Sequence, residues 1–343
     1  MNYKKLIAAG VLSVFASSAS YAEGELKLFN WGNYTSPELL EKFEKETGIK
    51  VTVDGYDSNE AMLAKIKAGG HGYDLSVPSD YMVKIMIDEG LLQPANVNEM
   101  ENFKNVKQEH VDVYFDPGRV YGAPWQFGST GISLNTKYYD GPKSDSWALA
   151  FDPPEELKGK INMVSEMNDV IAAGLFYLGL DQCNGNKDDL KKLNDMLIEA
   201  KKDWRTIDYG VIEKLTSEDV YMSHNWNGAS MRARLETPTV KYVFPKEGLV
   251  AWADNVVLLA EAQNVDNAKT FLNFIMAPEN AALISNFARY GNAIKGSEEF
   301  MDEVMASAPE ITGYEGAGTP QFIPPCPQEV TEFYTKIWNN LLK

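Results

Sequence analysis

The chain contains 343 residues with a formal net charge of −17, and 44% of its residues are hydrophobic. This charge argues against nucleic acid or an anionic membrane as a partner; it favours a cationic partner, but it is also typical of an acidic surface that keeps an exported protein soluble. The length exceeds what one hydrophobic core usually organises, so two lobes are expected.

The first 22 residues have the pattern of a secretory signal peptide. A basic "MNYKK" is followed by an apolar run over 6–18, and "SYA" supplies small residues for cleavage after Ala22. No later stretch approaches the roughly 20 uninterrupted apolar residues of a spanning helix. We therefore expect a soluble, exported mature protein.

The next segment alternates between strand and helix patterns. Strands are predicted at 25–31, 49–56 and 73–79, and helices at 35–48, 58–70 and 80–90. Thr35 or Ser36 caps the first helix, and Gly48 ends it. This alternation predicts an α/β fold with a largely parallel, open sheet, in which ligands bind at the carboxyl ends of the strands.

Aromatic and small polar residues follow two of these strands. Trp31 and Tyr34 come after the first strand, and Ser79 and Tyr81 come after the third. These positions suit an open-sheet binding site. Aromatic residues at strand ends also commonly pack beneath a neighbouring loop, so each pair alone is weak support.

A second α/β lobe is expected in the middle of the chain. A strand, a polar turn and an apolar helix span 159–179, and the turn carries Glu166 and Asp169. Acids in the first turn of a helix also interact favourably with its dipole, which gives a purely structural reason for both. Trp226 precedes a further predicted helix.

The strand-like run "GLVAWADNVVLLA" at 248–260 contains an aspartate. Trp252 and Asp254 lie two residues apart and therefore share one face of an extended strand. A carboxylate in such a run needs a partner, which is either an internal salt bridge or a cationic ligand.

The remaining motifs argue against catalysis. His71, His110 and His224 lack the spacing of a zinc site, and no nucleotide-binding or nucleophile motif is present. A carboxylate-dependent enzyme is the remote alternative, but Glu166 and Asp169 lie within one turn and cannot easily act from opposite sides of a bond. No metal or cofactor is expected. Cys183 and Cys326 are equally compatible with a disulfide and with two separate thiols.

Several stretches resemble the periplasmic spermidine/putrescine-binding proteins of ABC importers. The similarity covers nearly all of the mature chain, and the combination of "NW…Y", "PSxY", "WNG" and "WxD" is specific to that family. The stretches that carry it are 26–51, 58–83, 123–135, 225–234, 243–258 and 264–286.

The resemblance implies a two-lobe periplasmic-binding-protein fold, similar to type II, with the ligand in a cleft between lobes that crossing strands join. Lobe one would comprise 24–131 plus 254–297, and lobe two 132–253 plus 298–343. The crossings would be "FGSTGIS" at 127–133 and "AWADNVV" at 251–257.

The resemblance also implies a set of ligand-binding residues. The aromatic box would consist of Trp31, Tyr34, Tyr81, Trp226, Trp252 and Tyr290, with Ser79 as a polar lining residue. The carboxylates that match the family are Glu166, Asp169 and Asp254, and Gln321 matches a family glutamine in a loosely aligned region. Aromatic walls would contact methylene groups, and the carboxylates would bind ammonium groups.

One position departs from the family pattern. Many spermidine binders carry an acid before the tyrosine of the "NW" motif, where this chain has Gly32 and Asn33. Asn33 can still accept a hydrogen bond from an amine. The expected ligand is putrescine or spermidine, and the alternative is a quaternary ammonium or sulfonium compound in the same box.

The resemblance further implies a place and partners for the protein. We expect a periplasmic monomer that docks on an ABC transporter permease in the inner membrane and binds no nucleic acid. Closure of the lobes around the ligand would make it competent to dock.

Overall fold

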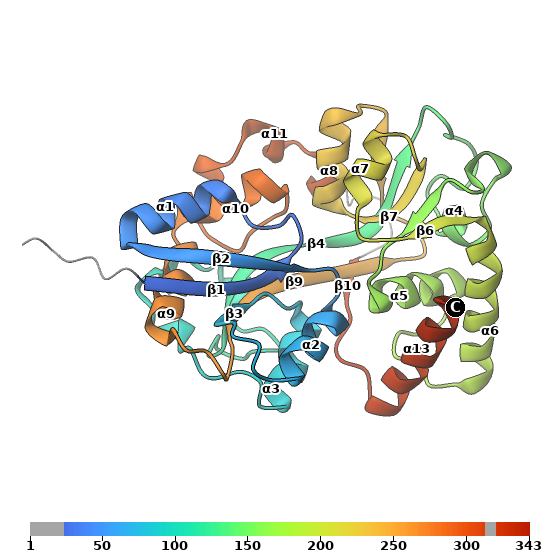
Figure 1. Cartoon of the computed structure of the whole chain (residues 1–343). Coiled ribbons are helices and arrows are strands. Elements are labelled where there is room, and N and C mark those ends of the chain that lie inside the picture. Colours follow the sequence, from blue (N-terminus) through green and yellow to red (C-terminus); the bar gives the residue numbers. More distant parts are fainter. Residues whose placement is uncertain (1–23, 313–319) are drawn as a thin grey trace, which may run out of the picture.

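The computed structural model describes residues 24–312 and 320–343 (Figure 1). The predicted signal peptide, residues 1–22, lies outside the described residues. The described chain is a mixed α/β protein with two lobes, drawn at the left and right of Figure 1, and strands β4 and β9 run between them. The predicted fold class is therefore confirmed.

The first lobe begins with the predicted alternation of strands and helices. Its N-terminal elements are β1 (Gly24–Trp31), α1 (Pro37–Thr47), β2 (Ile49–Tyr56), α2 (Asn59–Lys67), β3 (Leu75–Ser76) and α3 (Asp80–Asp88). Ser36 caps α1 by accepting a hydrogen bond from the Leu39 amide, and Gly48 ends it in the left-handed region at φ 74°. Helices α9 (Val265–Ile275) and α10 (Pro278–Ala288) complete the lobe.

Two long strands connect the lobes. They are β4 (Gly122–Asn135) and β9 (Leu249–Leu258), and they pair with each other antiparallel. The strand order is β2-β1-β3-β9-β4-β7-β5-β6, with β10 (Pro320–Phe322) on β9 and β8 (Val240–Val243) on β4. In this order β5 spans Ile161–Met163, β6 spans Trp204–Ile207 and β7 spans Met222–Trp226.

The expectation of a largely parallel sheet is correct only away from the centre. Strand β1 pairs parallel with β2 and β3, and β5 pairs parallel with β6 and β7. The central pairs β3·β9, β4·β9 and β4·β7 are antiparallel. Strands β4 and β9 run in opposite directions, so they pair antiparallel with each other. Each also pairs antiparallel with a strand of one lobe, β4 with β7 and β9 with β3, and the whole sheet is therefore mixed.

The second lobe repeats the α/β pattern. Its elements are α4 (Ala148–Phe151), β5 (Ile161–Met163), α5 (Met167–Leu178), α6 (Lys187–Ala200), β6 (Trp204–Ile207), α7 (Val211–Thr216), β7 (Met222–Trp226), α8 (Asn227–Glu236) and α13 (Gln328–Leu341). Short helices α11 (Glu303–Ala306) and α12 (Pro309–Thr312) precede the C-terminal segment. The 3₁₀ turns lie at Val97–Glu99, Glu101–Asn105, Gln108–His110, Glu155–Leu157, Lys201–Asp203 and Ser297–Phe300.

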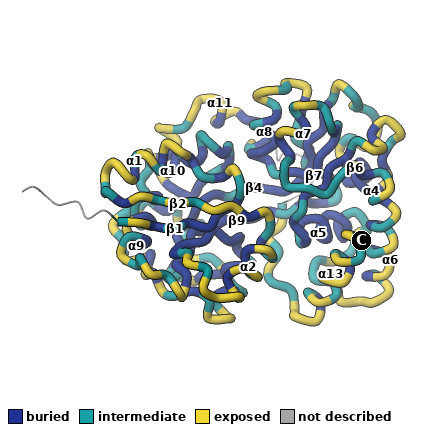
Figure 2. The backbone as a smooth tube through the Cα atoms, in the orientation of Figure 1, coloured by how far each residue is buried: buried dark blue, intermediate teal, exposed yellow. Residues whose placement is uncertain are grey.

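The buried apolar residues form a separate core in each lobe. One cluster extends from Leu26 to Trp125 and continues from Trp252 to Ile294. The other extends from Ile132 to Leu249 and includes Val330 to Leu341 of α13. Figure 2 shows this buried backbone along the inner strands of both lobes. The chain thus organises two cores around one pair of connecting strands.

A disulfide ties the C-terminal segment to the second lobe. Cys183, just after α5, is bonded to Cys326, just before α13. Of the two possibilities that the sequence left open, the structure therefore shows the bond. The bond fixes the short connection between β10, which pairs with the crossing strand β9, and α13. No helix in the described ranges is long and apolar enough to cross a membrane.

Candidate functional site

The lobes enclose a cavity of about 640 Å³ that brings together residues from distant parts of the chain. Ten of the residues predicted from sequence line it, and these are Trp31, Tyr34, Ser79, Tyr81, Glu166, Asp169, Trp226, Trp252, Asp254 and Tyr290. The first lobe contributes the carboxyl ends of β1 and β3, as the open-sheet rule predicts. The second lobe contributes the entries of α5 and α8.

Asp254 is held at one end of this cavity by two hydroxyl groups. Ser79 Oγ donates to Asp254 Oδ1 at 2.8 Å, and Tyr34 Oη donates to Oδ2 at 2.9 Å. The side chain is only 6% exposed, and burial raises its pKa to about 7. Neither donor carries a charge, so an internal salt bridge does not explain this aspartate.

Aromatic rings surround the Asp254 end. Tyr290 contacts Trp252 at 5.1 Å and Tyr34 at 5.6 Å between ring centroids, both edge to face. Two glycines make room for these rings. A Cβ at Gly128 would lie 2.6 Å from the Trp252 ring, and one at Gly228 would lie 2.5 Å from the Tyr290 ring.

A second group of rings extends across the cleft. Tyr209 of the second lobe stacks on Trp31 of the first at 6.4 Å and contacts Trp226 at 5.2 Å. Trp31 Nε1 donates to the Val77 carbonyl, which fixes the orientation of the indole. The box therefore has walls from both lobes.

Asp169 supplies a second buried carboxylate. Thr130 Oγ1 and Trp226 Nε1 both donate to its Oδ2, at 3.0 and 3.1 Å. Burial raises its pKa to about 6. Asp169 lies in the first turn of α5, as expected, but its hydrogen-bonding partners come from the crossing strand β4 and from the last residue of β7 rather than from its own helix.

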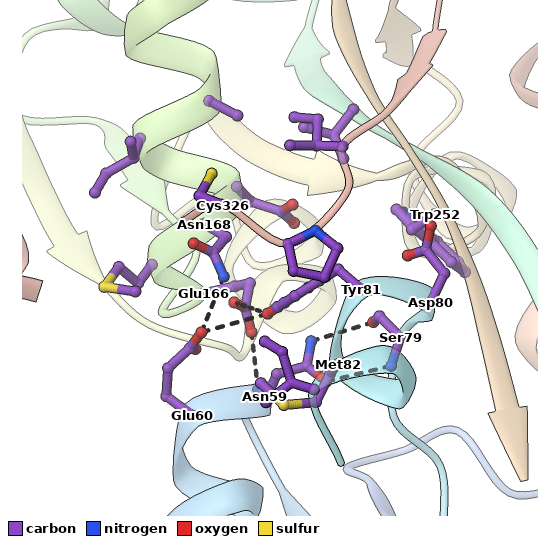
Figure 3. A pocket seen from close by; sticks show the side chains of 18 of the residues that line it. Asn59, Glu60, Ser79, Asp80, Tyr81, Met82, Glu166, Asn168, Trp252 and Cys326 are labelled. Atoms are coloured by element: carbon purple, nitrogen blue, oxygen red, sulfur yellow. Dashed lines mark hydrogen bonds between the residues drawn. The ribbon is translucent and has the colours of Figure 1, made fainter. Parts of the chain in front are cut away.

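Glu166 faces an acid that the sequence analysis did not single out. Glu60, in the first turn of α2, and Glu166, at the N-cap of α5, both contact the Tyr81 hydroxyl at 3.3 Å (Figure 3). The Asn59 amide donates to Glu166 Oε2 at 3.0 Å, and Asn168 Nδ2 donates to Glu60 Oε1 at 3.0 Å. Burial and the neighbouring acids Glu60 and Asp169 raise the pKa of Glu166 well above its usual range.

A chain of hydrogen bonds links the two carboxylate groups. Asn59 Nδ2 donates to Ser79 Oγ at 3.2 Å, and Ser79 Oγ donates to Asp254. The backbone N–H of Asn59 also donates to Glu166, so this one residue is linked through hydrogen bonds to both carboxylate groups.

Two predicted residues lie outside the cavity lining. Asn33 adopts φ 55° and accepts hydrogen bonds from Arg232 through its carbonyl and Oδ1, both at 3.2 Å, so it bridges the lobes. Gln321 is exposed on β10, which pairs with the outer part of β9. Asn33 thus takes part in a contact between the lobes, and Gln321 lies on the segment that leads to α13.

The cavity also contains residues that sequence reasoning missed. These are chiefly Asn59, Glu60, Asp80, Asn168 and Tyr209. Asp80 is buried and accepts from Tyr114 Oη at 3.0 Å, and burial raises its pKa to about 7. Asn59 and Glu60 follow the carboxyl end of β2, so the strand-end rule already pointed to them. Tyr209 has no comparable local signal.

A mixed α/β chain with two lobes, strands that cross between them and a ligand-sized cavity at their junction has the architecture of a solute-binding protein. The chain belongs to the family of bacterial extracellular solute-binding proteins, since the sequence model of that family matches residues 38–313.

Individual relatives and solved structures narrow this class. The chain is 29% identical to the putrescine-binding periplasmic protein SpuD of Pseudomonas aeruginosa, over 98% of this chain and 97% of that protein. It is 33% identical to the spermidine/putrescine-binding periplasmic protein of Escherichia coli, over 84% and 83% of the two chains. A Listeria monocytogenes structure described as a candidate spermidine/putrescine ABC transporter has a TM-score of 0.86 at 31% identity and covers 93% of this chain and 99% of that one. The resemblance inferred from the sequence motifs is confirmed.

Proposed function

We propose that this protein captures a polyamine, putrescine or spermidine, in its interlobe cavity and delivers it to the permease of an ABC importer. The observation that carries the proposal is the set of buried carboxylates, Asp254, Asp169 and Glu166, in one aromatic cavity. None of their described hydrogen-bonding partners is a cation. Buried acids without a counter-charge favour a cationic ligand.

The division of work between rings and acids suits a polyamine. A cation over an aromatic ring gains ~0.5 to 2 kcal/mol, which is less than the several kcal/mol that desolvation of an ammonium group costs. Charge-assisted hydrogen bonds to the carboxylates must therefore provide most of the recognition. The rings then pack against the methylene groups between the amines.

The same proposal includes the setting of the protein. Cleavage after Ala22 releases a periplasmic monomer that binds no nucleic acid and catalyses no reaction. Its lobes comprise 24–131 plus 254–297 and 132–253 plus 298–343. The two large apolar cores support this division except at Trp252, which packs in the first core. The site residues are those predicted from sequence, with Asn33 and Gln321 acting through the closed arrangement of the lobes.

Isothermal titration of ligand-stripped mature protein tests the function. The panel contains putrescine, spermidine and spermine, together with choline, betaine and a sulfonium compound. One-to-one binding of a polyamine is expected. A response to a quaternary ammonium or sulfonium compound, with no response to any polyamine, would overturn the proposal in favour of another organic cation.

A further inference from the structure

Glu60 and Glu166 approach each other from opposite lobes. Glu60 belongs to α2 of the first lobe, and Glu166 precedes α5 of the second. Figure 3 shows dashed lines from the Tyr81 hydroxyl to both carboxylates. The two acids thus share one wall of the cavity at the junction between the lobes.

One of the four oxygens of this carboxylate pair has no hydrogen-bond donor among the described residues, although Tyr81, the Asn59 backbone amide and Asn168 serve the other three. The Tyr81 hydroxyl has a single proton, so at any moment it donates to only one of the two acids. Glu60 Oε2 is buried and has no hydrogen-bond partner, although the residue as a whole is partly exposed. A buried carboxylate oxygen without a donor is costly, and an ammonium group would bring three donors.

The pair also lacks a positive charge. The charged groups that act on the pKa of Glu166 are Glu60 and Asp169, and both are acids. Burial raises the pKa of Glu60 as well. The described ion pairs of the chain, all formed elsewhere, involve neither glutamate; a nearby example is Lys67 with Glu89. The two acids therefore lie close together without a cation, among the described residues, that would offset the repulsion between their carboxylates.

The helix position of Glu60 does not explain this arrangement. An acid in the first turn interacts favourably with the helix dipole, and Glu38 occupies the same position in α1. Glu38 is exposed, whereas Glu60 is turned against another carboxylate in the cavity. The dipole accounts for an acid at this position but not for its contact with Glu166.

We propose that Glu60, together with Glu166, forms a second ammonium-binding subsite, separate from Asp254. This inference rests on the proposed function and narrows the substrate class to compounds with at least two ammonium groups.

A comparison of Glu60→Gln with Glu38→Gln tests the subsite. Putrescine has an ammonium group at each end, and butylamine keeps the carbon chain but has only one. Titration calorimetry should show that Glu60→Gln weakens putrescine binding by about tenfold or more. Butylamine, which uses the preassembled Asp254 end, should bind Glu60→Gln and wild type within about twofold. Glu38→Gln should change neither affinity.

The selectivity between the two amines separates a binding role from a structural one. The glutamine can still accept from Asn168 and can donate to Glu166, so the ligand-free variant should unfold at or above the wild-type temperature. Glu166→Gln provides a second variant with the same expected loss of putrescine selectivity. Equal loss for both amines, or unchanged putrescine affinity, would overturn the subsite while the proposed function stands. Failure of wild type to bind any polyamine would instead overturn the function itself.

Discussion

The Asp254 end and the Glu60–Glu166 end of the cavity are built in different ways. At the first, both carboxylate oxygens already have hydroxyl donors, and Asp254, Ser79 and Tyr34 lie at the junction of β9 with the first lobe. At the second, the acids come from different lobes and compete for one hydroxyl proton. If the lobes close around the ligand, as the proposed function requires, the Asp254 end is complete before closure and the Glu60–Glu166 end forms only on closure.

This difference indicates an order of events. A cation can bind first at the preassembled Asp254 end, against Trp252 and Tyr290. In the proposed function, its second ammonium group then lies between Glu60 and Glu166, offsets the repulsion between the two carboxylates and so holds the two lobes together. In this account, binding at the Glu60–Glu166 end favours the closed arrangement of the lobes over the open one. Such a shift of the open–closed equilibrium is what the proposed delivery of the ligand to a permease requires.

Asp254→Asn should have the largest effect on affinity. The variant keeps the shape of the side chain but removes a buried charge. Loss of the charge pair with an ammonium group costs about 2 to 5 kcal/mol, which is roughly thirtyfold to several thousandfold in the dissociation constant of putrescine. Asp195→Asn is the matched control, because Asp195 is an exposed acid that pairs with Lys191 on α6 and does not line the cavity. Titration calorimetry of both variants measures the difference, and unchanged putrescine affinity of Asp254→Asn would exclude an amine contact.

The pH dependence should be smaller and of defined sign. The pKa of Asp254 is raised to about 7 in the ligand-free protein, so lowering the pH from 8 to 6 should weaken putrescine binding by about tenfold as this carboxylate becomes protonated. The stability of the ligand-free protein should change in the opposite direction. Because the pKa of Asp254 is higher in the folded than in the unfolded protein, its contribution to the free energy of unfolding is fully present below about pH 4. That contribution is lost as the pH rises through about 7. Calorimetric titration and thermal unfolding between pH 5 and 8 check both signs. Asp254→Asn should reduce the slope of both curves, and the slope that remains belongs to the other buried acids, Asp80, Asp169 and Glu166.

Asn33→Gly should weaken putrescine binding only about threefold. It removes the Oδ1 acceptor that receives Arg232 across the lobes while keeping a residue that tolerates φ 55°. Asn96, which has φ 54° and is exposed away from the cavity, gives the matched Asn96→Gly control. A loss of tenfold or more at Asn33 alone would show that this side chain contacts the ligand directly.

Removal of the disulfide should have the smallest effect on affinity. Cys183 and Cys326 join two parts of the second lobe, so the double serine variant should bind putrescine within about twofold of wild type. Its free energy of unfolding should fall by about 2 to 5 kcal/mol because the unfolded chain loses a constraint. Unfolded, unreduced wild-type protein should contain no titratable thiol; free thiols there would contradict the bond.

The sequence predicted best what short-range patterns determine. Ser36 and Gly48 bound α1 as expected, β2 covers the predicted 49–56, and the alternating pattern of β9 put Trp252 and Asp254 into one cavity. The centre of the sheet was not predictable in this way. Its antiparallel pairing depends on which distant strands meet at β4 and β9, and no local signal records that choice.

The missed site residues show a second limit. Glu60 follows the carboxyl end of β2, where a site is expected, but its place in the first turn of α2 already gives a sufficient structural reason for an acid, so the sequence pattern alone does not assign it to the site. Only the approach of the other lobe, which brings Glu166 to the same hydroxyl, gives it a role. Tyr209 enters the box in the same manner, through contact with Trp31 across the cleft.

The most direct test is the ratio of the putrescine and butylamine affinities of ligand-stripped wild-type protein at pH 8. If each end of the cavity binds an ammonium group, putrescine should bind more tightly by about a hundredfold, because the second charge-assisted contact contributes about 3 kcal/mol. Equal affinities would mean that a single ammonium group is recognised. That result would contradict the two-ended account of the cavity.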